Sequence, residues 1–251
     1  LTSGTLYTNG QRIQETIINS TNNPVTVSYT FEAVVGTCAP SVQQSTSVLV
    51  NPNPQFSFVN ATGIICSGSP TDILFNSATA GHRINVVSVV YGAVTGGTVI
   101  PGTTTFVNGS RLTETLVNAT NAPQDVTYVF NVTTPFTSPV CPASPVNQTA
   151  VIRVNPIPNV SFAGATTICS NTTTDLQLNN PNGVAGTTFT WSVTATNVTG
   201  AFDGAGNRIN QALSSTDGNT PGTVTYTVVP AANACSGAPL IINVVVNPVP
   251  T

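Results

Sequence analysis

A short proline motif that recurs three times is the feature that most constrains what this chain can fold into. The motif reads Asn-Pro-x-Pro, stands at 51–54, 155–158 and 247–250, and follows an apolar run each time. Proline has no backbone N–H to donate and fixes φ, so a strand that reaches the motif has to stop. Two prolines so close together also make a short, stiff spacer. The motif therefore predicts linkers between tandem domains, formed by Pro52, Pro54, Pro156, Pro158, Pro248 and Pro250.

The spacing of the motif predicts the size of the domains. Its first prolines lie 104 and then 92 positions apart, which is the length of a domain and not of a solenoid repeat. We expect residues 1–54 to hold the C-terminal half of a repeat, 55–158 a complete repeat, and 159–251 a complete repeat with the start of the next linker. These are called the first, second and third repeats below. Because the chain opens in the middle of a repeat and shows no signal peptide, we expect a fragment or a processed product.

The composition predicts strands and excludes several functions. Only 5% of the 251 residues are charged, the net charge is −3, and the five basic residues are all arginines without a cluster. Such a chain cannot steer nucleic acid to a basic surface. No apolar run approaches the ~20 residues of a spanning helix, so this segment is not expected to insert into a membrane. The abundant Thr and Val favour strands, and Gly, Pro, Asn and Ser favour turns, which predicts an all-β protein.

Alternating apolar residues predict the strands themselves. Val224, Tyr226 and Val228 alternate with threonines, which is typical of a half-buried strand, and turn dipeptides such as Asn182-Gly183 separate the apolar runs. Six or seven short strands in about 95 residues are typical of an immunoglobulin-like β-sandwich. In the third repeat we expect strands near 159–163, 174–179, 187–196, 207–214, 223–230 and 239–247.

Five cysteines follow the same repeat pattern. The second and third repeats each hold an early and a late cysteine, whereas the first repeat holds only the late one. We therefore predict the disulfides Cys66–Cys141 and Cys169–Cys235, with Cys38 unpaired in this fragment. Crossed pairings and thiols that are simply buried remain open from sequence alone. Disulfides would indicate an oxidising, extracellular compartment.

A second motif, Gly-x-Arg-Ile/Leu-x-Glu/Gln-x-Ile/Leu, occurs at 10–17, 109–116 and 206–213. In a strand it places Glu15, Glu114 or Gln211 on the same face as its apolar neighbours. This polar side chain could be a catalytic or binding carboxylate, or it could satisfy loop amides at the rim of a sandwich. The glutamine in the third copy cannot exchange a proton as an acid–base group would, which favours the structural role.

Other candidate sites are weak. His82 is the only histidine, the cysteines lack metal-ligand spacing, and no Gly-x-Ser-x-Gly elbow is present. The segment 203–207 is expected to be a turn and not a calcium loop. Trp191 is expected in the core, near the predicted cystine, and not as a ligand platform. We therefore predict no catalytic, cofactor-binding or metal-binding residue, no cofactor, and no enzyme activity.

The chain resembles the PKD-like repeats of giant secreted surface proteins of Bacteroidota. The resemblance is carried by Ile-Cys-Ser at 168–170, Thr-Phe-Thr-Trp-Ser-Val at 188–193, Asn-Val-Thr-Gly at 197–200, Gly-Asn-Arg-Ile-Asn-Gln-Ala-Leu at 206–213, Gly-Thr-Val-Thr-Tyr-Thr-Val at 222–228 and the Val-Asn-Pro-x-Pro joint. It is strongest for 159–250 and looser for 55–158, which lacks the tryptophan. It implies immunoglobulin-like sandwiches in a long tandem array, as in the gliding-motility adhesin of flavobacteria, exported by the type IX secretion system.

The resemblance implies a non-catalytic stalk segment of a large adhesin or filament protein at the cell surface. Its partners would be neighbouring repeats of the same chain, with surface glycans or other adhesin chains as further candidates. Two alternatives stay open: the repeats themselves bind glycan or protein ligands, or they form an accessory region of a secreted hydrolase. The sequence leaves open whether upstream residues or another chain complete the first repeat.

Overall fold

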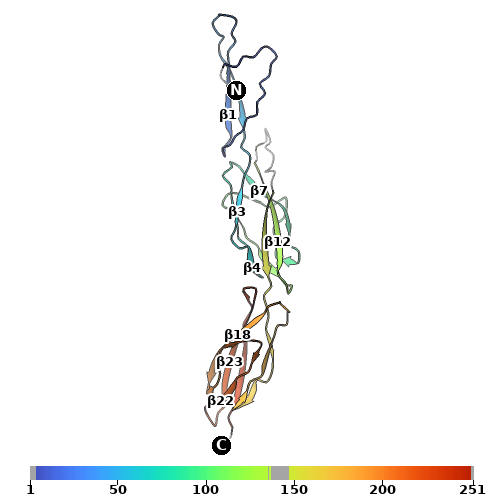
Figure 1. The fold of residues 1–251 in the computed structure, drawn as a ribbon, viewed down its shortest axis with the longest axis vertical. Coiled ribbons are helices and arrows are strands. Elements are labelled where there is room, and N and C mark those ends of the chain that lie inside the picture. The colour runs from blue at the N-terminus through green and yellow to red at the C-terminus, as the bar shows by residue number, and fades with distance from the viewer. Residues whose placement is uncertain (1–3, 135, 137–146, 250–251) are drawn as a thin grey trace.

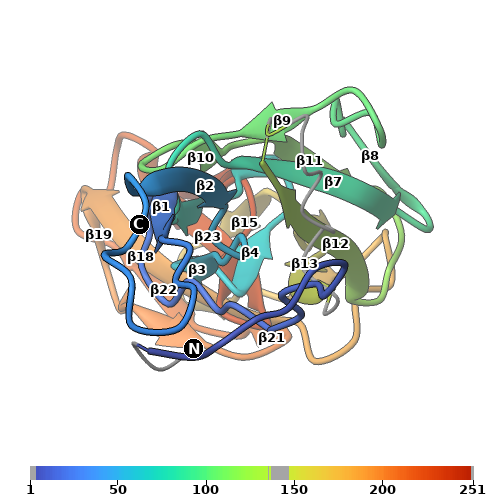
Figure 2. The ribbon, with the colours of Figure 1, turned by 90° about the horizontal axis from the view of Figure 1, so that it is seen from above.

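The computed structural model describes residues 4–134, 136 and 147–249, and shows a long, narrow molecule. The two ends of the chain lie at opposite ends of the rod (Figure 1), and a view along its axis shows the strands of all three repeats within one outline (Figure 2). All regular elements of the described residues are strands, labelled β1 to β25. No helix suited to crossing a membrane occurs in these parts of the chain. The all-β prediction is confirmed.

The first repeat is a single antiparallel hairpin. Its strands are β1 (Val25–Phe31) and β2 (Gln44–Val50), which pair along their whole length. The residues that would face a core remain accessible: Phe31 is 37% exposed, whereas Phe130, at the same place in the second repeat, is fully buried. The hairpin therefore has the alternation of a sandwich strand pair but no second sheet against it within the described residues.

The second repeat is a β-sandwich. A five-stranded sheet has the order β4-β13-β12-β7-β9, and shorter strands β10-β6-β3 and β5-β11-β8 make up the rest. The long strands are β7 (Arg83–Val90), β12 (Gln124–Thr133) and β13 (Gln148–Asn155). The short strands are β3 (Ser57–Asn60), β4 (Ile64–Cys66), β5 (Ser69–Pro70), β6 (Ile73–Asn76), β8 (Val94–Thr95), β9 (Thr105–Phe106), β10 (Arg111–Leu112) and β11 (Thr115–Asn118).

The third repeat has the same plan. Its main sheet has the order β15-β25-β23-β18-β20, with β24 beside β23, and β14-β17-β21 and β16-β22-β19 complete it. The long strands are β18 (Thr188–Thr196), β23 (Gly222–Ala232) and β25 (Leu240–Asn247). The short strands are β14 (Ser161–Ala163), β15 (Thr167–Cys169), β16 (Thr172–Thr173), β17 (Leu176–Asn179), β19 (Val198–Thr199), β20 (Gly204–Ala205), β21 (Arg208–Ile209), β22 (Ala212–Ser215) and β24 (Cys235–Ser236).

The predicted strands of the third repeat are confirmed to within a few residues, except that 207–214 divides into β21 and β22. Val224, Tyr226 and Val228 are fully buried, as their alternation predicts. The buried apolar residues form two separate clusters, one between Phe56 and Val154 and one between Leu176 and Val246. Each cluster is the core of one immunoglobulin-like β-sandwich.

Candidate functional site

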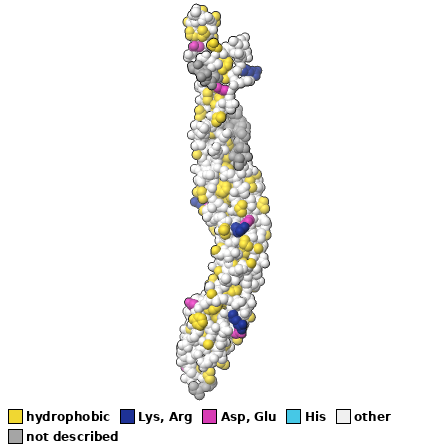
Figure 3. Space-filling model, viewed as in Figure 1, with side chains coloured by type: hydrophobic (Ala, Val, Ile, Leu, Met, Phe, Trp, Pro, Cys, Tyr) yellow, Lys and Arg dark blue, Asp and Glu magenta, His cyan; other side chains and the backbone are white. Residues whose placement is uncertain are grey.

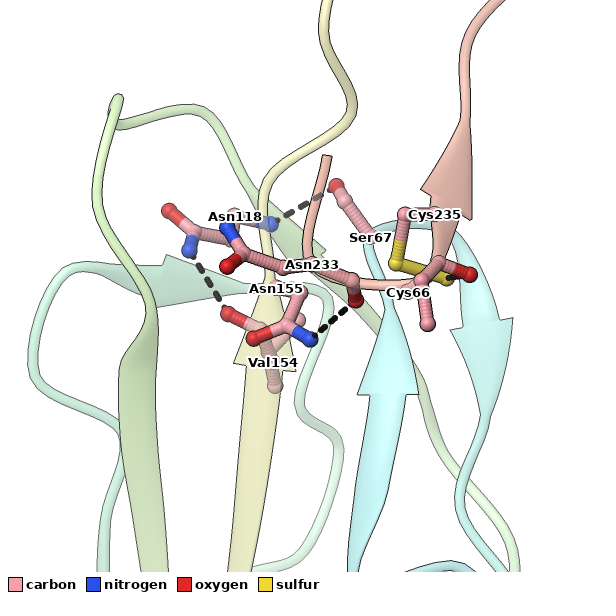
Figure 4. Close-up of a disulfide and its surroundings, with 8 residues drawn as sticks. Cys66, Ser67, Asn118, Val154, Asn155, Asn233 and Cys235 are labelled. Atoms are coloured by element: carbon pink, nitrogen blue, oxygen red, sulfur yellow. Dashed lines mark hydrogen bonds between the residues drawn. A yellow bond between two sulfur atoms is a disulfide. The ribbon is translucent and has the colours of Figure 1, made fainter. Parts of the chain in front are cut away.

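A disulfide joins the second and third repeats across the linker between them. Cys66, at the end of β4, is bonded to Cys235, at the start of β24, with a Cα–Cα distance of 5.6 Å (Figure 4). The bond spans 169 positions of sequence, and each sandwich contributes one sulfur. The joint between the repeats is therefore covalent as well as packed.

This bond shows that the predicted pairing of cysteines within each repeat is wrong. Cys66 is bonded to Cys235 and not to Cys141, and Cys169 has an exposed free thiol, as does Cys38. Cys141 itself lies outside the described residues. The pairing Cys169–Cys235 is likewise not formed.

The strand order gives the physical reason. β15 runs parallel to β25 and places Cys169 beside Asn247, at the last residue of β25. Cys235 pairs with Ala232, in the hairpin at the opposite end of the same sandwich. The eight residues of β25 separate these ends, about 25 Å at roughly 3.3 Å per residue. Disulfides need Cα atoms within about 7 Å, so the two cysteines of one repeat cannot reach each other.

Asparagine side chains form hydrogen bonds at the joint around the disulfide. Asn155, which is 5% exposed, donates a hydrogen bond from Nδ2 to the carbonyl oxygen of Asn233 at 2.9 Å (Figure 4). On the other side of the linker, Asn182 donates to the carbonyl oxygen of Ile157 at 2.8 Å and accepts from the amide of Asn159 at 3.0 Å. Because a side-chain amide can both donate and accept, these asparagines form hydrogen bonds with backbone groups of the linker and the turn that are not paired in a sheet.

The Asn233–Ala234 turn presents the hairpin to the linker. Both residues have positive φ, 50° and 61°, and Cys235 follows directly. Gly237 lies against the linker so closely that a side-chain carbon there would overlap the carbonyl oxygen of Pro158. A glycine at this position is thus required for the hairpin to approach the second repeat.

The linker prolines are packed and not exposed spacers. Pro52, Pro54, Pro156 and Pro158 are buried, and Pro248 is half-buried. Pro250 lies outside the described residues. A proline that is buried at the end of a strand fixes the direction of the chain and adds apolar contact area at the same time. The linkers therefore form part of the interface between repeats.

A buried carboxylate lies at the rim of the second sandwich. Glu114 is 4% exposed and accepts hydrogen bonds from the hydroxyls of Tyr128 at 2.5 Å and Tyr91 at 2.8 Å. It also accepts from the backbone amides of Thr98 and Val99, the latter at 2.7 Å. The hydroxyl of Thr98 donates to the same carboxylate at 3.3 Å, so each of these groups uses the side chain as an acceptor. The predicted contact of this residue with loop amides at the rim of the sandwich is confirmed.

Gln211 holds the same position in the third sandwich with different partners. It accepts from the hydroxyl of Tyr226 at 2.9 Å and from the amide of Phe202 at 3.2 Å. Its own amide donates to the carbonyl oxygen of Phe202 at 2.6 Å. One partner here is an acceptor, which requires a side chain that can both accept and donate. The second repeat has Glu where the loop presents two backbone N–H groups, and the third has Gln where the loop presents one N–H and one carbonyl oxygen.

Burial and this hydrogen bonding shift the pKa values of the tyrosines. Burial raises the pKa of Tyr128 and Tyr91 well above the ordinary value of 10.0, and the hydrogen bonds to Glu114 raise both further. Burial also raises the pKa of Tyr226. These tyrosines remain neutral and act as hydrogen-bond donors.

Three arginines form exposed pairs with aspartates, and Figure 3 shows dark-blue and magenta side chains next to each other on the surface. Arg111 pairs with Asp72, and Arg208 pairs with Asp175 at 2.5 Å, at equivalent places in the two sandwiches. The hydrogen bond from Arg153 lowers the pKa of Asp125. Exposed pairs of this kind contribute about 0–1 kcal/mol each, so they are a minor part of stability.

The remaining candidate residues have structural partners. His82 lies between the carbonyl oxygen of Thr79, 2.7 Å from Nδ1, and the amide of Asn108, which donates to Nε2 at 2.8 Å. Asp203 accepts from the amide of Val193 at 2.7 Å. No group of three potential metal ligands (His, Cys, Asp or Glu) was found in the described parts of the chain.

Trp191 lies in the core of the third sandwich, as predicted, and its indole N–H donates to the carbonyl oxygen of Phe202 at 3.3 Å. The Cys169–Cys235 cystine beside which we expected it is not formed.

The residues that the sequence analysis missed are the asparagines of the joint. Asn155 belongs to the Asn-Pro-x-Pro motif, but the prediction used only its prolines. The recurrence of asparagine at 51, 155 and 247 was the available signal. Asn51 and Asn155 are both buried, at 7% and 5% exposure, which is unusual for an uncharged polar side chain next to a linker.

Comparison with known proteins agrees with this architecture. Residues 166–250, about a third of the chain, match the family model of the PKD-like domain. No curated protein matches the chain. Residues 166–250 are thus similar to a PKD-like domain, and the second repeat shares the strand order of the third and its buried Glu/Gln–Tyr pair.

Solved structures with similar strand arrangements include the human desmocollin-1 ectodomain, with a TM-score of 0.38 and 10% identity over 85% of this chain and 46% of that one. Others are E. coli alpha-2-macroglobulin, with a TM-score of 0.33 and 9% identity over 88% and 19%, and a SusE-like surface-located polysaccharide-binding protein of Bacteroides thetaiotaomicron, with a TM-score of 0.29 and 10% identity over 78% and 34%. The chain spans less than half the length of each of these structures.

Proposed function

We propose that this chain is a non-catalytic, load-bearing stalk segment of a large extracellular adhesin or filament protein. Its division into repeats at 54 and 158 and its place at the cell surface belong to this proposal, as does export in the manner of the gliding-motility adhesins it resembles. Its partners are neighbouring repeats of the same kind. The observation that carries the proposal is the Cys66–Cys235 disulfide across the joint.

The disulfide determines which part of the chain a pulling force can extend. A force applied at the two ends enters the second repeat before Cys66 and leaves the third after Cys235. The covalent bond between them shields the 169 positions in between from extension. At about 3.5 Å per extended residue, the bond prevents about 600 Å of extension when the chain unfolds under load. A segment that spaces and bears load benefits directly from this arrangement.

Other features support the same role. The rod shape places the two ends of the chain far apart (Figure 1). Glu114, the buried acidic residue of the second sandwich, has every hydrogen-bond partner in the protein's own loops and strands. A disulfide is stable in the oxidising surroundings of secreted proteins. Buried linker prolines limit bending between repeats.

The test is single-molecule force spectroscopy on the 251-residue chain held at its two ends. The oxidised chain is expected to extend about 600 Å less on full unfolding than the same chain under a thiol reductant. Cys66→Ser, measured without reductant, should extend as far as the reduced wild type, and Cys38→Ser should not differ from the oxidised wild type. Equal extension of oxidised and reduced chains, or unfolding of both sandwiches at the lowest measurable force, would exclude the load-bearing role.

A further inference from the structure

The far end of the third repeat has the same construction as the end of the second repeat that carries the joint. In the second repeat, β4 runs parallel to β13 and pairs Cys66 with Asn155. In the third repeat, β15 runs parallel to β25 and pairs Cys169 with Asn247. Each cysteine is thus the last residue of a short parallel strand, beside the asparagine that begins an Asn-Pro-x-Pro motif.

The hydrogen bonds around the two ends match one by one. The amide after the cysteine donates to the carbonyl of the motif asparagine, from Ser67 at 2.8 Å and from Ser170 at 2.7 Å. The hydroxyls of the same serines accept from the next strand, at 2.9 Å from Asn118 and at 2.8 Å from Ser215. The parallel strand pair and the two serine hydrogen bonds that position Cys66 are therefore also present around Cys169.

The two ends differ in what covers them. Cys66 is bonded to the hairpin of the third repeat, and Pro156 beside it is buried. Cys169 is an exposed free thiol, Pro248 is only half-buried, and Val249 is 52% exposed. The surface that the hairpin covers in one repeat is open to solvent in the other.

We propose that Cys169, Asn247 and Pro248 form a docking site for the cysteine hairpin of a further PKD-like repeat, and that a disulfide to Cys169 closes it. The inference rests on the proposed stalk function and specifies its partner. The hairpin that fits this site resembles residues 230–237. Those residues have a tight turn at Asn233, whose carbonyl oxygen can accept a hydrogen bond, a cysteine two positions later and a glycine two positions after the cysteine. Cys38 lies at the corresponding place in the first repeat, in the loop between β1 and β2.

The bond-forming step is an ordinary thiol oxidation. The thiols of Cys169 and of the incoming cysteine together lose two electrons and two protons, and one S–S bond forms. A low-molecular-weight disulfide such as oxidised glutathione accepts them and becomes two thiols. The cysteines of successive repeats would then be linked in a staggered order, the early cysteine of each to the late cysteine of the next.

The experiment extends the full chain by one repeat. A copy of residues 159–251 is joined directly to Pro250, which keeps the Asn-Pro-x-Pro spacing of the natural joint, and the protein is folded with reduced and oxidised glutathione. The copy carries Thr167→Ser and Ser236→Thr, at two exposed positions, so that its cysteine peptides differ in mass from those of the original repeat. Disulfides are then mapped by mass spectrometry after cleavage without reductant. We expect Cys169 to be bonded to the appended counterpart of Cys235, and Cys169 alkylation, complete in the unextended chain, to be lost. The Cys66–Cys235 bond should be present in both chains.

Cys169→Ser in the extended chain is the matched control, and it should leave the appended counterpart of Cys235 free to alkylate. A bond within the appended repeat, or a Cys169 that remains alkylated, would overturn the proposal. Fluorescence of the added tryptophan shows whether the appended copy is folded. Neither result depends on the pulling experiment, so the docking site and the load-bearing role are tested separately.

Discussion

The hydroxyl of Tyr128 donates a hydrogen bond to the carboxylate of Glu114 at 2.5 Å, and the corresponding pair in the third repeat is Tyr226 and Gln211 at 2.9 Å. The tyrosine is in the same phase of the long central strand in both sandwiches. The acid or amide lies between two short strands, β10 and β11 in the second repeat and β21 and β22 in the third, and connects the core to a loop. This pair recurs within the chain, and each version is expected to require its own side chain.

Glu114→Gln should destabilise the second sandwich by about 1–3 kcal/mol, because the new amide N–H₂ group replaces an oxygen that accepts hydrogen bonds. The hydroxyls of Tyr91 and Tyr128 both donate to Oε2, and they lose this acceptor if the amide oxygen stays with the loop N–H groups. Denaturant unfolding followed by far-UV circular dichroism measures the loss. Trp191, the only tryptophan, lies in the third core and should report an unchanged transition.

Glu32→Gln is the control for that experiment, since it removes one negative charge from an exposed position of the first repeat. It should leave both transitions in place. An unchanged second-sandwich transition in the Glu114→Gln variant would show that the tyrosine hydroxyls find other acceptors.

Gln211→Glu should destabilise the third sandwich by a similar amount, about 1–3 kcal/mol, for the opposite reason. The carboxylate retains the bonds from Tyr226 and the Phe202 amide, but it removes one of the two donors to the Phe202 carbonyl oxygen and places a negative charge beside that oxygen. Trp191 donates to the same carbonyl, so its fluorescence reports the change directly. Asn243→Asp, at an exposed position on β25 whose side-chain oxygen accepts from Thr225, serves as a comparison of equal charge. A Gln211→Glu variant no less stable than Asn243→Asp would contradict the explanation.

These residues also show which features of the fold could be predicted from the sequence. The alternation of Val224, Tyr226 and Val228 was sufficient to predict a buried strand, because side-chain direction in a strand is a local property. The Glu/Gln exchange was sufficient to favour a structural role. The disulfide was not predictable in the same way. Which end of a sandwich Cys66 reaches depends on the parallel pairing of β4 with β13, a contact between residues about 90 positions apart.

Alkaline pH should destabilise the second sandwich. The pKa of Tyr128 and Tyr91 is raised above 10.0 in the folded state, so both keep their protons where the unfolded chain loses them. The unfolded state then binds fewer protons, and stability falls as pH rises above 10, whereas the contribution is fully present below it. Unfolding free energies measured from about pH 8 to about pH 11.5 on alkylated protein, with tyrosinate absorbance followed in parallel, test this.

Tyr91→Phe removes one of the two titrating hydroxyls, so the free energy of unfolding should fall less steeply as the pH rises above 10. Tyrosinate absorbance should rise together with unfolding for the buried residues and not before it. A flat stability profile over the same pH range would show that the tyrosines ionise without unfolding the sandwich.

Asn155→Asp should loosen the joint without unfolding either core. The aspartate cannot donate to the carbonyl oxygen of Asn233, which it would then face with a negative charge in a buried position. Weaker docking lowers the effective concentration of the two thiols for each other, so Cys66–Cys235 should be reduced more readily, about tenfold for each 1.4 kcal/mol lost. Titration with a dithiol reductant, followed by alkylation and mass, gives the ratio. Asn247→Asp is the matched control, because Asn247 has the same place in the third repeat but no described hairpin lies against it. Equal effects of the two substitutions would assign the change to the sandwich edge itself and not to the contact with Asn233.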